Sequence, residues 1–383
     1  MKTILLVCCA SLACAEQSDW QKRMQEANRL DREGRYAEAQ ALYTAGLAEA
    51  EKSGATGRQL AESLNNLAAH YFLRGEYAAA EPLYRRALEA WKAGGAGMKR
   101  DLGMTMSNLA TLYRKLGRYA EAGPLYAAAL PLLDPDSGNI RNNLAELYRA
   151  EGKYGEAEAE ARAALGIFER GAGSENVTGV ADALYTLASV YGDLHRYDEA
   201  LALLDRLHRM QEKLLGPEHP STASTLGAIA ATLTAERRFE EAEPLARRVL
   251  EIRRKTLGPE HPDVAAALNN LAQVERLQGR YIEAEPLYRQ ALAIWENKLG
   301  PDHPAVAAGL CNLADFYHER GRESAAESLY ARALAILEKS LGSGNPRVSS
   351  VRARLAEVYR AEGRERKARQ LEGAPEAGAS ALR

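Results

Sequence analysis

Residues 262–299 read PDVAAALNNLAQVERLQGRYIEAEPLYRQALAIWENKL, and this stretch decides the fold. Pro262 can begin a helix, because the first N–H groups of a helix have no intrahelical partner. Leu268 and Leu271 recur at helical spacing and belong to an apolar stripe. Gly279 ends that helix, since glycine takes the left-handed cap conformation without strain. The stretch therefore predicts a helix, a tight turn and a second helix.

The second helix is predicted to pack back on the first, with Tyr281 at the turn. Its buried face is expected to consist of Ala284, Leu287, Tyr288, Ala291 and Leu292. We expect Pro286 to fall in or near the first turn, where its missing N–H does little harm. Pro82, Pro124 and Pro244 hold the same place in other parts of the chain.

This unit repeats along the 383 residues with a usual period of 42. The turn glycine recurs as Gly34, Gly75, Gly117, Gly152, Gly279, Gly321 and Gly363, and His195 and Arg237 fill the two gaps in the series. An alanine stands seven residues before and five residues after each of these nine positions. The pattern predicts nine helix pairs that stack as a solenoid, in which each unit contacts only its neighbours.

Two departures from the period have structural consequences. The step from Gly117 to Gly152 is 35 residues, so that seven residues, or two helical turns, are missing and stacking stays in phase. The helix before this gap is predicted to end near Leu133. His195 and Arg237 stand where glycine favours a left-handed turn, which costs any other residue roughly 1–2 kcal/mol. The alternative is that either residue forms a different cap. We therefore expect faster hydrogen exchange in residues 180–240 than in residues 262–340.

The N-terminus, MKTILLVCCASLACAEQ, has the form of an export signal. Lys2 precedes twelve apolar or small residues, which are too few to span a bilayer, and Ala13-Cys14-Ala15 fits a cleavage site before Glu16. The sequence predicts a protein exported to the periplasm or the extracellular space. The alternatives are an uncleaved apolar arm and a lipid anchor on Cys14, for which Leu12 lies one place too close.

Composition argues against nucleic-acid binding and against a disulfide within the chain. The net charge of −2 and the absence of a basic excess argue against nucleic-acid binding. Cys311 is the one cysteine outside the predicted signal, so that it can pair only between chains; we expect it instead to be a small helix residue.

No catalytic motif is found, so we predict that the protein is not an enzyme and has no cofactor. The glycine-rich stretch 94–100 lacks the spacing of a phosphate-binding loop. His219, His261 and His303 recur every 42 residues, but side chains one repeat apart are about 8–10 Å apart, too far to share one metal ion. We expect each histidine to close the turn between two units, with no metal site.

Polar side chains form rows along the first helices. One row is Asn65, Asn142 and Asn269; the row beside it is Asn66, Asn108, Asn143, Asn270 and Asn312. Two turns further on lie Arg114, Arg149, Arg276, His318 and Arg360. Asparagine can donate to and accept from a peptide backbone, and arginine can bind carboxylates in a bidentate manner. Both patterns also arise without a ligand, since basic residues are favoured at helix C-termini.

The repeats resemble tetratricopeptide repeats. Asn66–Leu88 and Asn108–Leu130 follow the pattern N-L-A-x-x-Y-x-x-x-G-x-Y-x-E-A-x-x-L-Y-x-x-A-L almost completely, and the connectors at 215–220, 257–262 and 299–304 resemble those of kinesin light chains. The resemblance implies an all-α, right-handed superhelical solenoid. It also implies that the polar rows line a concave groove for peptides.

We therefore predict three segments: an export signal peptide at 1–15, a single solenoid of nine helix-turn-helix repeats at 16–372 and a disordered tail at 373–383. The predicted function is a non-catalytic scaffold that binds a protein or peptide with acidic residues through Asn66, Asn108, Arg114, Asn143, Arg149, Asn270, Arg276, Asn312, His318 and Arg360. The alternative is a structural or self-assembling exported protein.

Overall fold

The computed structural model describes residues 18–52, 54, 57–133, 137–171 and 174–372. These residues form eighteen α-helices and a short 3₁₀ turn, η1 (Ala96–Met98), with no strand among them. The helices are α1 (Asp19–Arg32), α2 (Tyr36–Lys52), α3 (Arg58–Leu73), α4 (Tyr77–Ala93), α5 (Lys99–Lys115), α6 (Tyr119–Leu133), α7 (Gly138–Ala150), α8 (Tyr154–Arg170), α9 (Ser174–Asp193), α10 (Tyr197–Leu215), α11 (Pro220–Ala235), α12 (Phe239–Leu257), α13 (Pro262–Leu277), α14 (Tyr281–Leu299), α15 (Pro304–Glu319), α16 (Glu323–Leu341), α17 (Pro346–Ala361) and α18 (Glu365–Glu372). The predicted all-α fold is confirmed, as is the end of α6 at Leu133.

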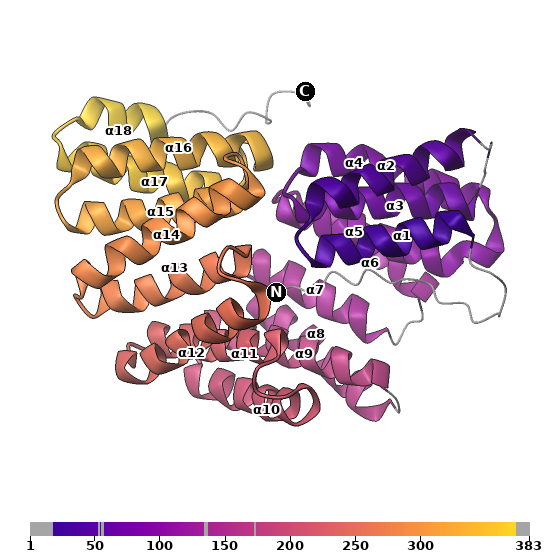
Figure 1. Cartoon of the computed structure of the whole chain (residues 1–383), viewed down its shortest axis with the longest axis horizontal. Helices are drawn as coiled ribbons and strands as arrows, with labels where there is room; N and C mark the ends of the chain where they lie inside the picture. The colour runs from indigo at the N-terminus through magenta and orange to yellow at the C-terminus, as the bar shows by residue number, and fades with distance from the viewer. Residues whose placement is uncertain (1–17, 53, 55–56, 134–136, 172–173, 373–383) are drawn as a thin grey trace. The chain divides into compact units, whose positions relative to one another are not determined.

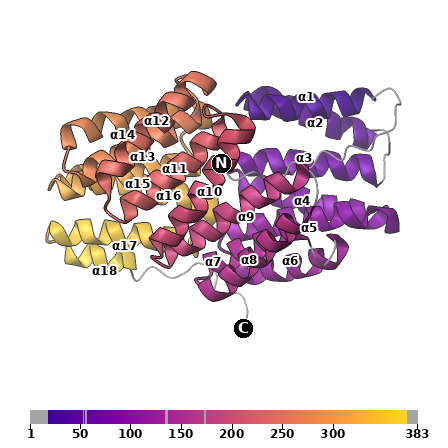
Figure 2. The same cartoon turned by 90° about the horizontal axis from the view of Figure 1, so that it is seen from below.

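The chain divides into two compact units, Met1–Leu147 and Tyr148–Arg383. Within each unit, consecutive helices run antiparallel and each pair packs on the next (Figures 1 and 2). The single continuous solenoid over residues 16–372 stays a prediction. The predicted signal at 1–15 and the predicted tail at 373–383 lie outside the described residues.

All nine predicted turns are confirmed, including the two without glycine. The seven turn glycines have φ between 66° and 79°, and His195 and Arg237 have φ of 58° and 65°. Both residues therefore take the left-handed conformation rather than a different cap. His195 gains a partial compensation, since its Nδ1 lies 2.7 Å from the hydroxyl of Tyr197.

The recurring histidines close the connections between repeats, as predicted. The Nδ1 atoms of His219, His261 and His303 accept hydrogen bonds of 3.0–3.1 Å from the backbone N–H two residues further on. A proline follows each histidine as the first helical residue. Asn345 caps α17 in the same way, through Oδ1 and the N–H of Arg347 at 2.9 Å. A side-chain acceptor with a following proline is a strong start signal for a helix.

The prolines of the second helices lie further along than expected. Because α14 begins at Tyr281, Pro286 is its sixth residue and lies in the second turn, not the first. Pro82, Pro124 and Pro244 occupy the same place in α4, α6 and α12. The missing N–H of Pro286 leaves the carbonyl of Ile282 without its intrahelical donor. Ile282 is 88% exposed, so that this carbonyl lies on the solvent side of the helix.

A recurring polar cluster, which sequence analysis missed, joins successive pairs. Tyr317 donates to Glu285 at 2.7 Å, Arg289 donates to both, and Arg322 stacks on the Tyr317 ring at 4.4 Å. Related clusters are Glu81, Arg85, Tyr113 and Arg118 in the first unit, and Glu158, Arg162, Tyr191 and Arg196 in the second. The signal was present in the recurring Glu-x-x-x-Arg spacing of the second helices and in the arginine after the turn residue.

Candidate functional site

The first helices of successive pairs form an inner face. In the first unit α1, α3 and α5 approach one another more closely than the second helices do, and in the second unit α11, α13 and α15 do the same. This asymmetry curves each stack toward its first helices. A ligand on that side can touch several repeats at once.

Asparagine side chains on the inner face form a ladder between repeats. The Nδ2 of Asn108 donates to Asn65 Oδ1 at 3.1 Å, and that of Asn312 donates to Asn269 Oδ1 at 3.0 Å. Asn143 makes the equivalent bond to the hydroxyl of Ser107 at 3.0 Å. Three of the predicted asparagines therefore use their amide N–H groups to join one first helix to the previous one.

Asn66 and Asn270 are not part of this ladder. The position that should accept from Asn270 is Gly227, which has no side chain, and the position facing Asn66 is the apolar Met24. The side chain of neither asparagine forms a hydrogen bond with another residue that the structure describes. Asn270 is also exposed, so its amide can both donate to and accept from a peptide backbone.

The predicted basic row has its charges matched within the chain. Arg114 pairs with Glu146 at 3.3 Å, and both side chains are only 8% exposed. Arg149 pairs with Asp193 at 2.8 Å, Arg276 with Glu319, His318 with Glu323 at 2.6 Å and Arg360 with Glu372 at 2.6 Å. The predicted local excess of positive charge is therefore balanced by carboxylates that the sequence pattern did not reveal.

A hollow of about 210 Å³ opens beside Asn270 on the inner face of the second unit. It is lined by α11 (Gly227, Ala230, Ala231, Thr234, Ala235), α12 (Ala246, Val249) and α13 (Ala267, Asn270, Gln273, Val274, Leu277). The hollow exists because α11 carries mostly glycine and alanine on this side. Asn270 and Gln273 place two side-chain amides at an otherwise apolar surface.

Arg253 is buried one turn beyond this hollow. Its side chain donates to the carbonyl of Asp263 at 3.0 Å and to the hydroxyl of Ser224 at 3.3 Å. Arg253 is 8% exposed, and no carboxylate of the described residues lies within ion-pair distance of it. Burial lowers the pKa of its guanidinium, while the more distant Asp263 carboxylate opposes this shift.

The corresponding position in other repeats is apolar. It holds Trp91, Phe168, Trp295 and Leu337, all of which are buried, but in the preceding repeat it holds the half-buried, polar Gln211. Arg253 therefore replaces a core residue with a charge. No pattern on the first helices pointed to it, because it lies on a second helix; comparison of equivalent positions across repeats could have found it.

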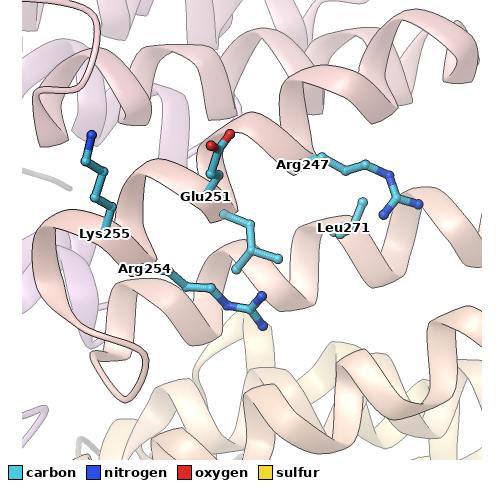
Figure 3. Close-up of a pocket in the computed structure, with 6 residues that line it drawn as sticks. Arg247, Glu251, Arg254, Lys255 and Leu271 are labelled. Atoms are coloured by element: carbon cyan, nitrogen blue, oxygen red, sulfur yellow. The ribbon is translucent and has the colours of Figure 1, made fainter.

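A second, larger hollow of about 570 Å³ lies against α12 and is lined by Arg247, Leu250, Glu251, Arg254, Lys255 and Leu271 (Figure 3). Arg247 is bonded to Glu243 and Glu275, and Lys255 is bonded to Glu218. Two of its three cations are thus already neutralised. Most of the polar side chains that line this hollow therefore already have partners, unlike Asn270 beside the smaller hollow.

The remaining candidate chemistry is sparse. Among the described residues, no group of three or more His, Cys, Asp and Glu side chains is placed to hold a metal ion. No helix in the described part of the chain is long and apolar enough to cross a membrane. Cys311 is buried, and desolvation raises the pKa of its thiol to about 11. A buried, protonated thiol is unsuited to pairing between chains.

A family model described as a tetratricopeptide repeat matches residues 30–93, 101–173, 179–255, 228–281, 263–339 and 307–372. No match to the sequence is found among curated proteins.

Several solved structures are similar to this chain. A Podosopora anserina putative kinesin light chain with nearly identical TPR-like repeats is 32% identical, over 49% of this chain and 89% of that one, with a TM-score of 0.42. Aspartyl phosphate phosphatase F from Bacillus subtilis is 15% identical over 97% and 99% of the two chains, with a TM-score of 0.55. A Rap protein complexed with Competence and Sporulation Factor is 15% identical over 88% and 99%, with a TM-score of 0.53. The last two similarities concern the fold.

Proposed function

Because the chain belongs to the tetratricopeptide repeat family, we propose that it is a non-catalytic scaffold that binds an extended peptide segment of another protein on the inner face of its second unit. The observation that carries this proposal is the hollow beside Asn270, whose amide has no partner within the described chain. Tetratricopeptide repeats typically mediate protein–protein interaction. One protein of the same fold was solved in complex with a factor, which supports a binding role by analogy only.

The hollow suits one side chain of a peptide better than a whole small molecule. Its volume of about 210 Å³ lies below the range of about 300–1,000 Å³ that is usual for small-molecule sites. An apolar side chain in the hollow supplies the buried contact area that dominates affinity. Asn270 and Gln273 then bind the peptide backbone on either side of that anchor.

The other predicted residues take part unequally. Asn108, Asn143 and Asn312 have their N–H groups engaged in the ladder, so that their Oδ1 atoms are proposed as acceptors for peptide N–H groups. Asn66 is the counterpart of Asn270 in the first unit. Arg114, Arg149, Arg276, His318 and Arg360 remain proposed contacts for acidic residues at the edges of the groove, although each would exchange an existing carboxylate for the ligand's.

Gly227→Asn is the variant that tests this proposal. An added Cβ at Gly227 lies 4.0 Å from Val249, an ordinary contact, so that the substitution should be tolerated. The new side chain fills the hollow. Its Oδ1 accepts a hydrogen bond from Asn270, as Asn269 accepts one from Asn312, so that the Asn270 amide is no longer free to bind a peptide. Peptides selected from a display library on the wild-type chain should lose at least tenfold in affinity, measured by calorimetry. Gly227→Ala is the matched control, which narrows the hollow without the amide.

Two results would contradict the proposal. Selected peptides that bind Gly227→Asn with unchanged affinity would place the binding site elsewhere. Failure of the wild type to select any peptide, together with concentration-dependent self-association in sedimentation velocity, would favour the structural or self-assembling alternative.

Export completes the proposed role and rests on the N-terminal sequence alone. We expect the mature chain to begin at Glu16, in the periplasm or outside the cell. Mass spectrometry of protein from the native host decides the point. An intact Met1 would contradict export, and a diacylglycerol on Cys14 would show a lipid anchor in place of a cleaved signal.

A further inference from the structure

A buried histidine and a buried carboxylate join the first helix pair to the second. His70 on α3 is fully buried, and its Nδ1 lies 2.7 Å from Oδ1 of Asp31 on α1, whose side chain is 2% exposed. At the other end of the same two helices, Trp20 donates to the hydroxyl of Ser63 at 2.9 Å. Of these two contacts, only the Asp31–His70 pair can change its charge near neutral pH, because imidazole is the side chain that ordinarily titrates between pH 5 and pH 8.

The stacking of the repeats does not require this pair. His70 lies five residues before its turn residue, and in the later first helices this position is apolar and buried, except in α11, where it is Thr232. Asp31 stands on α1 where α5 carries Arg114 and α13 carries Arg276. The pair is therefore particular to one junction between repeats. The apolar residues at the position of His70 are Leu112, Leu147, Val190, Val274, Phe316 and Val358.

The surroundings of the pair are aromatic. The rings of Tyr43, Tyr71 and Tyr36 lie around the His70 ring, with their centroids 5.5, 5.8 and 6.5 Å from its own. Nε2 of His70 and Oδ2 of Asp31 are buried, and neither has a hydrogen-bond partner among the residues that the structure describes. The charge of the pair must therefore be balanced within the pair itself.

Neighbouring charged groups do not balance it. Arg74 lies one turn beyond His70 on α3, but its guanidinium lies over the Tyr36 ring, 5.5 Å from the centroid, and pairs with Glu76 at 2.9 Å. Among the described residues of α1, α2, α4 and α5, Asp31 is the one charged side chain bonded to His70.

The two charge states of the pair differ in their cost. With a neutral imidazole, Nδ1–H donates to the carboxylate of Asp31, and one negative charge remains uncompensated in the core. With a second proton on Nε2 of His70 the two charges compensate each other, and one N–H is left without an acceptor. A buried charge without a counter-charge costs more than one missing hydrogen bond. The charged form of the pair therefore joins α1 to α3 more strongly than the neutral form.

We propose that the Asp31–His70 pair is a pH-sensitive latch, which holds the helix pair α1–α2 on α3 more firmly when the imidazole is charged than when it is neutral. Release of the latch at higher pH uncovers Leu64 and Leu67 of α3, which are buried in one cluster with residues of α1 and α2. The latch lies at the N-terminal end of the first unit and does not depend on the proposed peptide site.

Hydrogen exchange of α1 at pH 5 and pH 8 tests the latch, after correction for the pH dependence of the chemical exchange rate. In the wild type, the amides of α1 should be about tenfold better protected at pH 5 than at pH 8, as expected for a hydrogen bond to a charged group. The control lies in the same molecule: α13–α15, where Val274 stands in place of His70, should show no such difference.

Two substitutions separate the charge of the pair from its packing. Asp31→Asn keeps an acceptor for Nδ1–H but removes the carboxylate. The α1 amides should then be better protected at pH 8 than at pH 5, the reverse of the wild type, because a charged imidazole would be buried without a counter-charge. His70→Gln keeps a donor to Asp31 and does not titrate, so that α1 should be equally protected at both pH values. Circular dichroism checks that both variants fold.

Reversal in Asp31→Asn together with loss of the pH dependence in His70→Gln would establish the latch. Equal protection of α1 at pH 5 and pH 8 in the wild type would overturn it, as would a pH-dependent change of the same size in α13–α15. The inference also fails if Asp31→Asn keeps the wild-type order, since the carboxylate would then not be the cause. If one variant does not fold, the wild-type comparison and the other variant decide the question.

Discussion

The second unit contains two neighbouring regions whose helix pairs stack through different turn residues, polar contacts and core residues. In α13–α16 the turns use glycine, Asn312 is bonded to Asn269, and Trp295 fills the core. In α9–α12 the turns use His195 and Arg237, no asparagine ladder is present, and Arg253 occupies the place of Trp295. The hollow lies where these two regions meet. A solenoid can therefore gather polar groups without partners in one repeat while the neighbouring repeats hold the stack together.

The largest effect is expected from Trp295→Ala. The Trp295 ring is 7% exposed, donates to the carbonyl of Pro262 at 3.1 Å and packs against Gly309. Its removal should lower the local free energy of unfolding by about 3–5 kcal/mol, as for other buried aromatic residues. Hydrogen exchange of α13–α15 measures this loss. A loss below about 1 kcal/mol would show that the well-packed region does not depend on this ring.

The wild-type protein should show a difference in local stability between the two regions. Two non-glycine residues in the left-handed conformation, His195 and Arg237, each cost roughly 1–2 kcal/mol. Residues 180–240 should therefore exchange at least tenfold faster than residues 262–340. Because each repeat contacts only its neighbours, the loss of stability should remain local. Equal protection from hydrogen exchange in both spans would show that the two regions do not differ in stability.

Replacing the two non-glycine turn residues should reduce the difference in local stability between the two regions. His195→Gly and Arg237→Gly should each raise the local stability by roughly 1 kcal/mol, because glycine takes positive φ without strain. Gly279→Ala, which creates the same strain in the well-packed region, is the reciprocal control and should destabilise it by a similar amount. The measurement is hydrogen exchange of the flanking helices. The idea fails if neither glycine variant slows exchange.

The smallest effect concerns Asp182 on α9, which forms no ion pair with any residue that the structure describes and whose pKa is raised by desolvation to about 6. The folded chain therefore holds this proton more tightly than the unfolded chain does, where the carboxyl titrates near pH 4. The stability that protonation confers is fully present below pH 4 and is lost as the pH rises through 6. Asp182→Asn should be more stable than the wild type at pH 8, and the difference should shrink between pH 6 and pH 4. Thermal unfolding at these pH values tests it; a difference independent of pH would mean that the charge is not the cause.

The local structure could be predicted from the sequence alone. The helix pairs, the nine left-handed turns, the histidine caps and the end of α6 were all predictable, because each depends on a few consecutive residues and on backbone geometry. The period placed His195 and Arg237 at turn positions but left a different cap open, and the structure shows both with positive φ. The place of Pro286 was predicted a turn too early, since the sequence does not show at which residue after Gly279 the helix begins.

Which side chains remain free to bind could be seen only from the way the repeats stack. Asn312 and Asn270 look alike in sequence, yet the first is bonded to Asn269 and the second faces the missing side chain of Gly227. Arg276 looks available until Glu319 is found beside it, 43 residues further along. Arg253 looks like a surface residue until its burial is seen. The reason is physical: the availability of a polar group depends on the partner that stacking brings to it, and that partner lies one repeat away in the chain.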